Sequence, residues 1–537
     1  MSRTAHIDTF ARDNLPPRSQ WPELSFTLPE LQYPERLNCA VELLDAMVAQ
    51  GHGERVALRT PDGVCTYRQL MVRANQIAHV LREDWKLVPG NRVLLRGPNN
   101  PMMAACWLAV IKAGCIAVAT MPLLRAKELT QVIDKAQIGA ALCDARLMAE
   151  LRLAQRDCPT LKQVLHFNAS GSGSLEDLLA GKSIGFENCD TATDDVALIA
   201  FTSGTTGQPK GTLHFHRDVL AMCDCFPRSI LKPTADDIFC GTPPLAFTFG
   251  LGGMLCFPLR FGASVVLMER LLPETLLQAI QHFKVSICFT APTFWRQMAP
   301  LVKRFDLFSL KQCVSAGEAL PDTTRQLWKE ASGIEIIDGI GSTEMIHIFI
   351  SHTPEKVRRG ATGYAIPGYQ ACVVDDNGNP LPPGTVGRLA VKGPTGCRYL
   401  ADDRQRNYVK NGWNLTGDAY RMDEDGYFFY QARTDDMIIS AGYNIGGPEV
   451  EDCLLKHPAV AECGVVGVPD EERGQIVKAF VALRPGHAVS DALTRELQDY
   501  VKNNIAPYKY PRAIEYVEQL PRTETGKLQR FKLRQHS

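Results

Sequence analysis

Residues 202–211, with the sequence Thr-Ser-Gly-Thr-Thr-Gly-Gln-Pro-Lys-Gly, constrain the fold more than any other segment of the chain. The apolar run 196–201 precedes them and predicts a buried strand. Glycines let the main chain approach an anion and turn N–H groups toward it. Hydroxyl side chains add further donors, and Lys210 adds a positive charge. This strand and loop predict a site that holds the phosphates of a nucleotide.

The spacing of the loop differs from that of the common P-loop, which requires G-x-x-x-x-G-K followed by Ser or Thr. Here the glycines stand at positions 204, 207 and 211, and neither Ser nor Thr follows Lys210. The loop therefore indicates a nucleoside triphosphate site of a different family. An ordinary flexible turn is the competing interpretation, and the ordered string of hydroxyl, glycine and lysine residues argues against it.

A length of 537 residues is too great for one hydrophobic core, so several domains are expected. Charged residues make up 22% of the chain and the formal net charge is −1, which argues against a nucleic-acid-binding protein. The 17 cysteines are scattered without repeated spacing, which favours reduced thiols over a disulfide framework. The closest pair, Cys223 and Cys225, has no second pair at zinc-ligand spacing, so we expect no metal there.

No segment predicts a signal peptide or a membrane span. Charged residues, beginning with Arg3, interrupt any apolar run near the start of the chain. The most apolar stretch, residues 102–124, contains Lys112 and Pro122, whereas a spanning helix needs about 20 uninterrupted apolar residues. We instead expect a buried helix there, followed by a strand at 115–120. A cytoplasmic protein without a membrane partner is therefore expected.

Strand-like apolar runs alternate with helix-like segments through most of the chain, which predicts a layered α/β architecture. Residues 368–393 differ, because short alternating runs are separated by turn sequences such as Asp-Asn-Gly-Asn-Pro. That pattern predicts antiparallel hairpins in a small barrel or sheet.

A boundary is expected near residues 433–436, followed by a compact α+β module of normal domain size. In this module we expect a helix at 449–456 and a second helix that has Ser490 as its N-cap. The expected strands are 459–468, 477–483 and 512–517. We therefore divide the chain into a large N-terminal domain, residues 1–434, and a small C-terminal domain, residues 435–537.

Four further strings follow the phosphate loop, each weak by itself: 338–344, 416–418, 433–442 and 521–527. In this order, and together with the loop, they resemble the adenylate-forming superfamily of acyl-CoA synthetases, peptide-synthetase adenylation domains and firefly luciferase. The resemblance covers nearly the whole chain. The chain looks most like benzoate–CoA and 2-aminobenzoate–CoA ligases, on the strings 315–321 and 338–349, and the opening 8–17 points to the aminobenzoate branch.

The resemblance implies an α/β fold of layered subdomains with a small β-barrel-like part and a mobile C-terminal lid domain. It also implies a ligase of aromatic degradation that uses ATP, Mg²⁺ and coenzyme A. A small aromatic carboxylate attacks the α-phosphate of ATP, which gives an acyl-adenylate and pyrophosphate. The thiol of coenzyme A then attacks the acyl carbon, and AMP leaves.

The implied chemistry needs no general base, because a carboxyl group with a pKa near ~4 is already ionised at pH 7. The difficulty is that two anions have to approach each other. The site has to supply positive charge and hydrogen-bond donors where charge develops.

By resemblance, Lys210 and Thr343 serve the phosphates, and Lys527 bridges the carboxylate and the phosphate during adenylation. Asp418 and Arg433 match residues that hold the ribose. Glu344 is the best metal candidate, because Mg²⁺ prefers one or two carboxylates with phosphate oxygens and water. The implied nucleotide-binding residues are Thr202, Ser203, Gly204, Thr205, Thr206, Gly207, Lys210, Gly317, Glu318, Asp338, Gly339, Thr343, Asp418 and Arg433.

Asp435 matches the hinge of the family. After adenylation the C-terminal domain is expected to rotate, which withdraws Lys527. The same rotation presents Ser440, Gly442 and Tyr443 to the pantetheine of coenzyme A, where a side chain at position 442 would block the thiol.

Six residues match positions that line the benzoate site of relatives: Ala246, Phe247, Ala316, Gly341, His347 and Ile348. An aromatic wall with small neighbours suits a flat ring. Phe247 is a departure, since benzoate ligases tend to carry Tyr there. His347 has two interpretations, an acceptor for a ring amino group or a packed histidine with a structural partner.

Three alternatives stay open. The first two are a medium-chain fatty acyl-CoA ligase and a stand-alone adenylation enzyme that loads a carrier protein. No Asp that would hold an amino-acid ammonium lies within residues 244–253, which disfavours the carrier-loading alternative. The third is a non-catalytic ATP-binding protein, against which the intact Lys210, Glu344, Asp418 and Lys527 argue. Both a monomer and a homodimer agree with the sequence.

Overall fold

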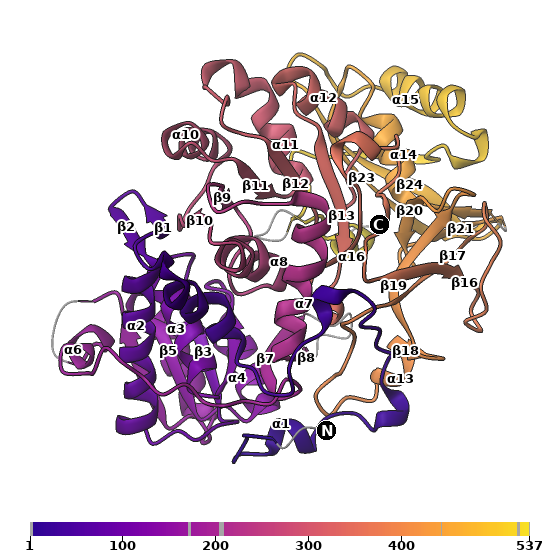
Figure 1. The fold of residues 1–537 in the computed structure, drawn as a ribbon. Helices are drawn as coiled ribbons and strands as arrows, with labels where there is room; N and C mark the ends of the chain where they lie inside the picture. Colours follow the sequence, from indigo (N-terminus) through magenta and orange to yellow (C-terminus); the bar gives the residue numbers. More distant parts are fainter. Residues whose placement is uncertain (1–3, 170–172, 203–208, 442, 523–526, 536–537) are drawn as a thin grey trace.

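The computed structural model describes residues 4–169, 173–202, 209–441, 443–522 and 527–535. Four sheets organise these residues (Figure 1). Two large sheets with helices on both faces form the first part of the chain, and an antiparallel sheet follows. A separate sheet with its own helices forms the C-terminal part. The predicted layered α/β fold, with its antiparallel part and its α+β C-terminal module, is confirmed.

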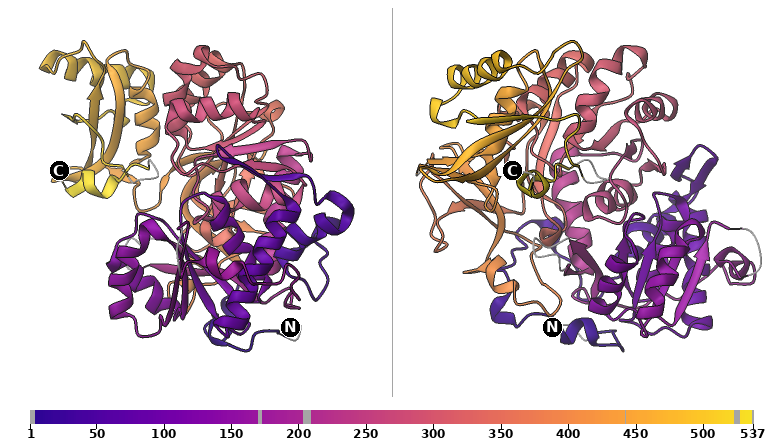
Figure 2. Two further views of the ribbon diagram at one scale, coloured as in Figure 1. Left: turned by 90° about the vertical axis from the view of Figure 1, so that its left-hand side faces the viewer. Right: turned by 180° about the vertical axis from the view of Figure 1, so that it is seen from behind.

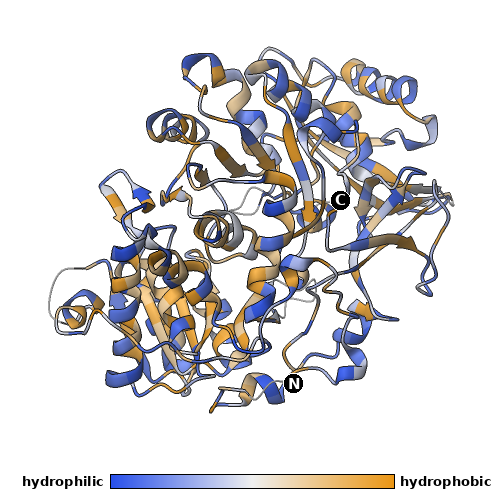
Figure 3. Ribbon diagram, in the orientation of Figure 1, coloured by the Kyte–Doolittle hydropathy of each residue, from blue (hydrophilic) through white to orange (hydrophobic). Residues whose placement is uncertain are grey.

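The six-stranded sheet has the order β6-β5-β3-β4-β7-β8 and is parallel except for β8. Its strands are β3 (Arg92–Arg96), β4 (Ile116–Thr120), β5 (Ala140–Asp144), β6 (Gln163–Phe167), β7 (Val196–Thr202) and β8 (Lys210–Phe215). Both faces are covered: α2 (Tyr67–His79) and α3 (Pro101–Lys112) lie on one, and α4 (Ala126–Ala136) and α5 (Met148–Asp157) on the other. Accordingly Val93 and Leu95 of β3 belong to one apolar cluster and Leu94 to the other. Figure 3 shows the strands as an apolar layer.

The nine-stranded sheet has the order β15-β14-β13-β12-β11-β9-β10-β1-β2. Its strands are β1 (Val56–Thr60), β2 (Gly63–Thr66), β9 (Ile238–Gly241), β10 (Ser264–Val266), β11 (Ile287–Thr290), β12 (Gln312–Ser315), β13 (Ile336–Gly341), β14 (Ile348–Ser351) and β15 (Tyr364–Ala365). Three helices cover one face, around Trp295 and Trp328: α10 (Pro273–Phe283), α11 (Pro292–Met298) and α12 (Asp322–Ser332). Residues of α7 (His216–Phe226) and α8 (Thr248–Leu251) join the cluster that this sheet shares with the six-stranded sheet. The two sheets are therefore held against each other by one continuous core.

The antiparallel sheet follows in the chain and carries residues of the site. It consists of β16 (Gln370–Val374), β17 (Val386–Lys392), β18 (Val409–Lys410), β19 (Trp413–Met422) and β20 (Phe428–Arg433). Strands β16 and β17 pair from Gln370↔Lys392 to Val374↔Arg388, which confirms the hairpin predicted within 368–393.

The C-terminal sheet has the order β22-β21-β24-β23, with β25 beside β24. Its strands are β21 (Ile438–Ser440), β22 (Tyr443–Ile445), β23 (Val460–Asp470), β24 (Gly474–Leu483) and β25 (Ala513–Tyr516). Helices α14 (Gly447–Leu454) and α15 (Asp491–Asn504) pack on one face, and α16 (Arg530–Gln535) on the other. The predicted N-cap is confirmed, because Leu493 N donates to Ser490 Oγ at 3.1 Å.

The C-terminal part lies beside α11 and α12 of the nine-stranded sheet (Figure 2). Arg296 Nη2 donates to the carbonyl oxygen of Ala461 at 2.8 Å, and Thr323 Oγ1 donates to Asp452 Oδ1 at 3.1 Å. Polar bonds of this kind fix one arrangement of the two parts while leaving the interface separable.

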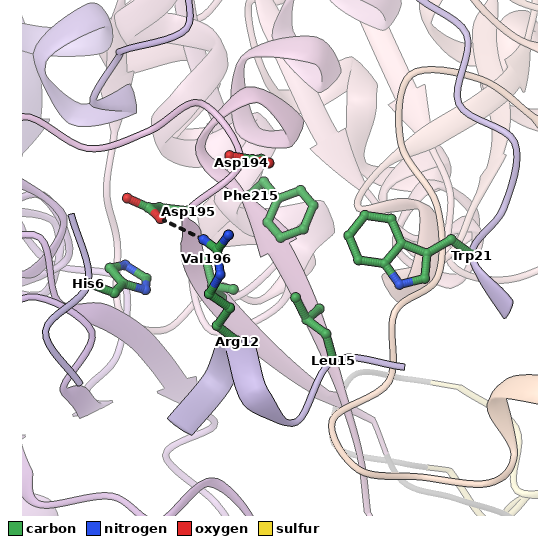
Figure 4. A pocket seen from close by; sticks show the side chains of 8 residues that line it. All are labelled: His6, Arg12, Leu15, Trp21, Asp194, Asp195, Val196 and Phe215. Carbon is green, nitrogen blue, oxygen red and sulfur yellow. Dashed lines mark ion pairs between the residues drawn. The ribbon is translucent and has the colours of Figure 1, made fainter. Parts of the chain in front are cut away.

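The start of the described chain is tied down by Asp195. Its carboxylate accepts from Thr4 Oγ1 and from Ala5 N, and Arg12 Nη1 lies 3.8 Å from Asp195 Oδ1. A hollow of about 10 Å³ lies there, lined by His6, Trp21 and Phe215 among others (Figure 4). Because that volume is about the size of one water molecule, we assign the hollow to packing and not to ligand binding.

All 17 cysteines are unpaired thiols. Fourteen of them are buried, and Cys65, Cys189 and Cys372 are half-buried. Burial raises the pKa of every one of these thiols, from Cys65 at the first edge strand to Cys463 in the C-terminal sheet. The structure joins no two of these cysteines, in agreement with the expectation that no disulfide framework is present.

A buried ion pair joins the segment before α13 (Gln405–Tyr408) to the first turn of α7, which directly follows β8. Arg398 Nη2 donates to Asp218 Oδ2 at 2.8 Å, and both side chains are fully buried. Phe215 lies below the guanidinium at 4.1 Å, and Phe215 N donates to Asp218 Oδ2 at 2.9 Å. Burial alone would raise the pKa of Asp218, but Arg398 and its neighbours hold it below its usual range.

Replacing Arg398 should destabilise the fold, because it leaves the Asp218 carboxylate buried without its cation. We expect Arg398→Met to lower the stability of the N-terminal part by about 3–5 kcal/mol in urea unfolding. Arg404→Met is the control, since Arg404 pairs with Asp402 at a partly exposed site and should cost less than about 1 kcal/mol. Equal losses in the two variants would contradict this assignment.

Candidate functional site

The ends of the phosphate loop meet across two antiparallel strands. Thr202, the last residue of β7, pairs with Lys210, the first residue of β8. Ser203, Gly204, Thr205, Thr206 and Gly207 lie outside the described residues. The loop thus joins two strands of a hairpin, whereas a common P-loop leads from a strand into a helix. This topology agrees with the glycine spacing of the loop, which differs from that of the common P-loop.

Lys210 is held by a tyrosine that sequence reasoning did not single out. Its Nζ donates to Tyr399 Oη at 3.1 Å, and the Tyr399 hydroxyl donates to Glu344 Oε1 at 2.6 Å. Lys210 Nζ lies 3.7 Å from Glu344 Oε1. Tyr399 is 1% exposed, and burial followed by the charge of Glu344 raises its pKa, so it remains a neutral donor. Tyr399 therefore joins the cation of the phosphate loop to the metal candidate.

The backbone explains why Tyr399 reaches this place. Thr212 of β8 and Tyr399 form an antiparallel bridge. Leu213 N donates to Arg398 O at 2.8 Å, and Leu400 N donates to Gly211 O at 2.8 Å. The segment around Tyr399 thus runs as an additional short strand beside Lys210.

Thr343 and Glu344 lie in a single 3-10 turn, η10 (Thr343–Met345), directly after β13. Ser342 caps the turn, because its Oγ accepts from Met345 N at 3.2 Å. His214 Nε2 lies 2.8 Å from Thr343 O, which ties the turn to β8 of the other sheet. The turn therefore presents Thr343 and Glu344 between the two sheets, at the end of the phosphate-loop hairpin.

Asp418 and Arg433, the predicted ribose residues, face each other on β19 and β20. Arg433 Nη1 donates to Asp418 Oδ1 at 3.2 Å, and Arg433 Nε lies 3.7 Å from Asp435 Oδ1. Burial raises the pKa of Asp418, and the charge of Arg433 opposes that effect. The pair is placed where the antiparallel sheet leads into the C-terminal part.

Lys527 comes from the C-terminal part and lies over Gly317. A Cβ built on Gly317 would be 3.5 Å from Lys527 Cε and 3.9 Å from Nζ. Gly317 has φ +91°, which favours glycine. Lys527 as a whole is exposed, but burial around its ammonium lowers its pKa, and the charge of Glu318 opposes that shift. The structure thus brings Lys527 to residues that the sequence assigned to the nucleotide.

Asp338 lies on β13 of the nine-stranded sheet, with Gly339 after it. Burial raises the pKa of Asp338 to about 7, and Arg325 opposes that shift. Glu318 lies in the loop between β12 and α12, and its side chain faces Thr293 of α11, whose Oγ1 donates to Glu318 Oε2 at 3.1 Å.

Three rings surround His347, which is 3% exposed. The centroids of Phe257, Phe249 and Phe226 lie 4.6, 5.5 and 5.6 Å from that of His347. Burial lowers the pKa of His347 to about 3, with the main chain of Phe249 opposing, so the ring is neutral. Neither ring nitrogen has a hydrogen bond of normal geometry to a described residue. The main chain of Phe249 engages the ring, so His347 offers an acceptor nitrogen inside an aromatic enclosure.

Small residues border this enclosure. A Cβ built on Gly252 would lie 2.6 Å from His347 Cδ2, and one on Gly341 would lie 2.6 Å from the main chain of His347. Ala316 and Ile348 are buried in the same apolar cluster. Phe247, the predicted pocket residue, is the N-cap of α8. Within the stretch 244–253, it is the ring of Phe249 that lies beside His347. Phe249 was not singled out, because the sequence does not show which phenylalanine turns inward.

The residues assigned to the coenzyme A tunnel lie on the C-terminal sheet. Ser440 ends β21 and is buried, and Tyr443 begins β22, is half exposed and stacks on Tyr508 at 4.4 Å. Gly442 lies outside the described residues.

A magnesium ion fits the residues present. Among the described residues there is no cluster of three or more His, Cys, Asp or Glu side chains that could hold a metal by themselves. Mg²⁺ prefers one or two carboxylates with phosphate oxygens and water, so the single Glu344 beside Lys210 suits an ion that arrives with a nucleotide.

None of the described helices is long and apolar enough to span a bilayer.

Comparison with known proteins decides the family. Residues 46–399 match the family described as AMP-binding enzyme, and residues 449–527 match the AMP-binding enzyme C-terminal domain. The chain belongs to the AMP-binding enzyme family. A benzoate–CoA ligase of Thauera aromatica is 35% identical over 516 residues, which are 95% of this chain and 98% of that protein. The mitochondrial acyl-coenzyme A synthetase ACSM3 of Rattus norvegicus is 31% identical over 529 residues, 94% of this chain and 91% of that protein.

A solved structure shows the same fold throughout. The anthranilate CoA ligase AuaEII in complex with anthranoyl-AMP has a TM-score of 0.89 and 33% identity, and the match covers 95% of this chain and 99% of that chain. The predicted membership in the adenylate-forming superfamily is confirmed. The protein is an adenylate-forming acyl-CoA ligase, an AMP-forming acid–thiol ligase whose family uses ATP and coenzyme A.

Removing the hydroxyl of Tyr399 should weaken nucleotide binding, because Glu344 and Lys210 lose their shared partner. A hydrogen bond to a charged group contributes about 1.5–3 kcal/mol, so Tyr399→Phe should raise the Kd for MgATP roughly tenfold or more in calorimetry. Tyr67→Phe is the matched control, since the buried Tyr67 hydroxyl donates to the carbonyl oxygen of Ala263 at 2.7 Å instead. The bridging role of Tyr399 is refuted when both variants bind MgATP like the parent enzyme.

Proposed function

We propose that this ligase activates a flat aromatic carboxylic acid of the benzoate or 2-aminobenzoate type and transfers it to coenzyme A. The observation that carries the proposal is the enclosure of His347 by Phe226, Phe249 and Phe257, bordered by glycine and alanine residues. Flat rings suit such an enclosure, because aromatic side chains pack on them edge to face or with an offset. The names of the benzoate and anthranilate ligases to which the chain is similar support the same class of substrate.

The state of His347 favours 2-aminobenzoate over benzoate. A buried polar atom without a hydrogen-bond partner costs roughly 1–3 kcal/mol. A ring amino group can donate to the acceptor nitrogen of neutral His347, whereas unsubstituted benzoate leaves that nitrogen unmatched. The difference is enough for a ten- to hundredfold preference.

In the proposed first half-reaction, the chain supplies cations and donors to two anions. Lys527 bridges the carboxylate and the α-phosphate, Thr343 donates to the α-phosphate, and Lys210 faces the β- and γ-phosphates. A lysine ammonium suits the bridging position, because a compact point charge can follow charge from one oxygen to another. Glu344 would hold Mg²⁺, which when bound neutralises charge on the phosphates. Asp418 and Arg433 orient the ribose.

In the proposed second half-reaction, the C-terminal part turns about Asp435. Lys527 leaves the site, and the edge formed by Ser440, Gly442 and Tyr443 lines the path of the pantetheine thiol. The exposed position of Tyr443 on β22 supports this role, because a surface that docks only in the second step has to be free in the first.

A panel of carboxylates tests the substrate. The assay measures pyrophosphate release in the presence of coenzyme A, Mg²⁺ and ATP. We expect kcat/KM for 2-aminobenzoate to be at least tenfold higher than for benzoate, and the difference from octanoate to be larger still. His347→Leu should remove the preference between the two aromatic acids, because it removes the acceptor and keeps an apolar wall. A higher kcat/KM for octanoate would replace the proposal with an aliphatic substrate, and acylation of a phosphopantetheinyl carrier in place of coenzyme A would replace the acceptor.

The role of Lys527 is tested by separating the half-reactions. Lys527→Ala should lower ATP–pyrophosphate exchange about 100-fold or more, because it removes the charge between the two anions. Thioester formation from supplied acyl-adenylate should be retained. Lys532→Ala, which changes an exposed lysine of α16, should leave both half-reactions unaltered. Equal loss of both half-reactions in Lys527→Ala would contradict the assignment.

A further inference from the structure

The carboxylate of Glu318 lies at the junction of the N-terminal and C-terminal parts. On the N-terminal side, Thr293 Oγ1 donates to Glu318 Oε2 at 3.1 Å. The Glu318 side chain is 17% exposed, so this carboxylate is largely withdrawn from water. A carboxylate at such a position needs cations or donors around it.

Those partners come from the C-terminal part. Arg522 Nη1 lies 3.9 Å from Glu318 Oε1 and donates to Thr293 Oγ1 at 3.4 Å. Burial raises the pKa of Glu318. The charges of Arg522 and Lys527 oppose this shift, and so does the main-chain N–H of Leu528, which donates a hydrogen bond to the carboxylate. Arg522 and Leu528 also pair with each other as an antiparallel bridge. Glu318 therefore engages both members of the bridge that borders Lys527.

The neighbour of Glu318 in the chain is the residue that Lys527 covers. A Cβ on Gly317 would lie 3.5 Å from Lys527 Cε. A contact at Glu318 thus fixes the C-terminal segment within one residue of the place where the Lys527 ammonium lies. Loss of that contact would leave the ammonium free to move by more than the reaction tolerates, since a displacement of 1 Å can cost about 100-fold in rate.

Arg522 has a second carboxylate, but that one moves with it. Arg522 Nη2 donates to Glu462 Oε2 at 3.1 Å, and Glu462 lies on β23 of the C-terminal sheet. When the C-terminal part turns, the contact between Arg522 and Glu462 is kept within that part, whereas the contact with Glu318 breaks. Of these two carboxylates, only Glu318 contacts Arg522 before the C-terminal part turns and loses that contact afterwards.

We propose that Glu318 is a positioning residue for adenylate formation, which docks Arg522 and Leu528 and thereby holds Lys527 over Gly317. Glu318 acts through Lys527 and not on the acid or the phosphates. The inference rests on the proposed function, in which Lys527 serves the first half-reaction only. It follows that Glu318 matters for adenylation and not for thioester formation.

The test is Glu318→Gln, which keeps the size of the side chain and removes its charge. ATP–pyrophosphate exchange with 2-aminobenzoate should fall about tenfold in kcat, with less than a threefold change in KM for ATP and for the acid. Thioester formation from supplied acyl-adenylate should match the parent enzyme. Glu462→Gln is the matched control, since it neutralises the other partner of Arg522, and it should change exchange less than twofold.

A charge reversal separates docking from a general loss of structure. Glu318→Arg and Arg522→Glu should each lower exchange, and the double variant should recover at least part of it. The proposal is overturned if Glu318→Gln exchanges like the parent, if it loses both half-reactions equally, or if it raises KM for ATP while kcat is kept. Absence of exchange in the parent enzyme with every carboxylate would instead refute the proposed function, so the two failures are distinguishable.

Discussion

Repulsion between a carboxylate and a triphosphate is the constraint on which this structure depends. Solvation by water cannot relieve this repulsion during the reaction, because the reaction requires the two anions to be in contact. In the proposed mechanism the chain supplies cations from distant segments: Lys210 at the start of β8 and Lys527 beyond the C-terminal sheet. Each has a carboxylate nearby, Glu344 for Lys210 and Glu318 for Lys527, so that neither is left as an isolated charge.

The two large sheets give these charges fixed positions. Their shared apolar core contains residues of both β7 and β13, and His214 of β8 joins the two sheets again at Thr343. The C-terminal part is attached differently, by hydrogen bonds and ion pairs at Arg296, Thr323 and Glu318. A dry core resists rearrangement, while polar contacts exchange readily for water. This difference suits the proposed mechanism, in which Lys210 stays in place and Lys527 moves.

Much of the fold could be read from the sequence, because local patterns and long-range structure agree. The apolar run before the phosphate loop forms β7, and α15 begins at Ser490, whose side chain accepts a hydrogen bond from Leu493 N. The boundary at 434/435 and the hinge at Asp435 stay predictions, since they concern motion. Residues 203–208 of the phosphate loop lie outside the described part, so their contacts stay predictions too.

The site was less predictable where a residue acts across sequence distance. Tyr399 belongs to no motif that the sequence shows, and only the pairing of its segment with β8 brings it to Glu344. The assignment of Glu318 to the nucleotide stays a prediction, whereas the contact of its side chain with Arg522, far along the chain, could not be read from any local pattern. Phe249 and Phe247 are indistinguishable by pattern, since the turn into α8 decides which ring enters the enclosure.

The cysteines bear on selectivity between nucleophiles. An acyl-adenylate is an electrophile made for attack by a thiol, and the thiolate is the reactive form. An enzyme with 17 thiols of its own risks acylating itself. Because all of these thiols are buried or half-buried and burial raises their pKa values, they stay protonated and out of reach. The incoming coenzyme is thereby left without competitors from within the protein.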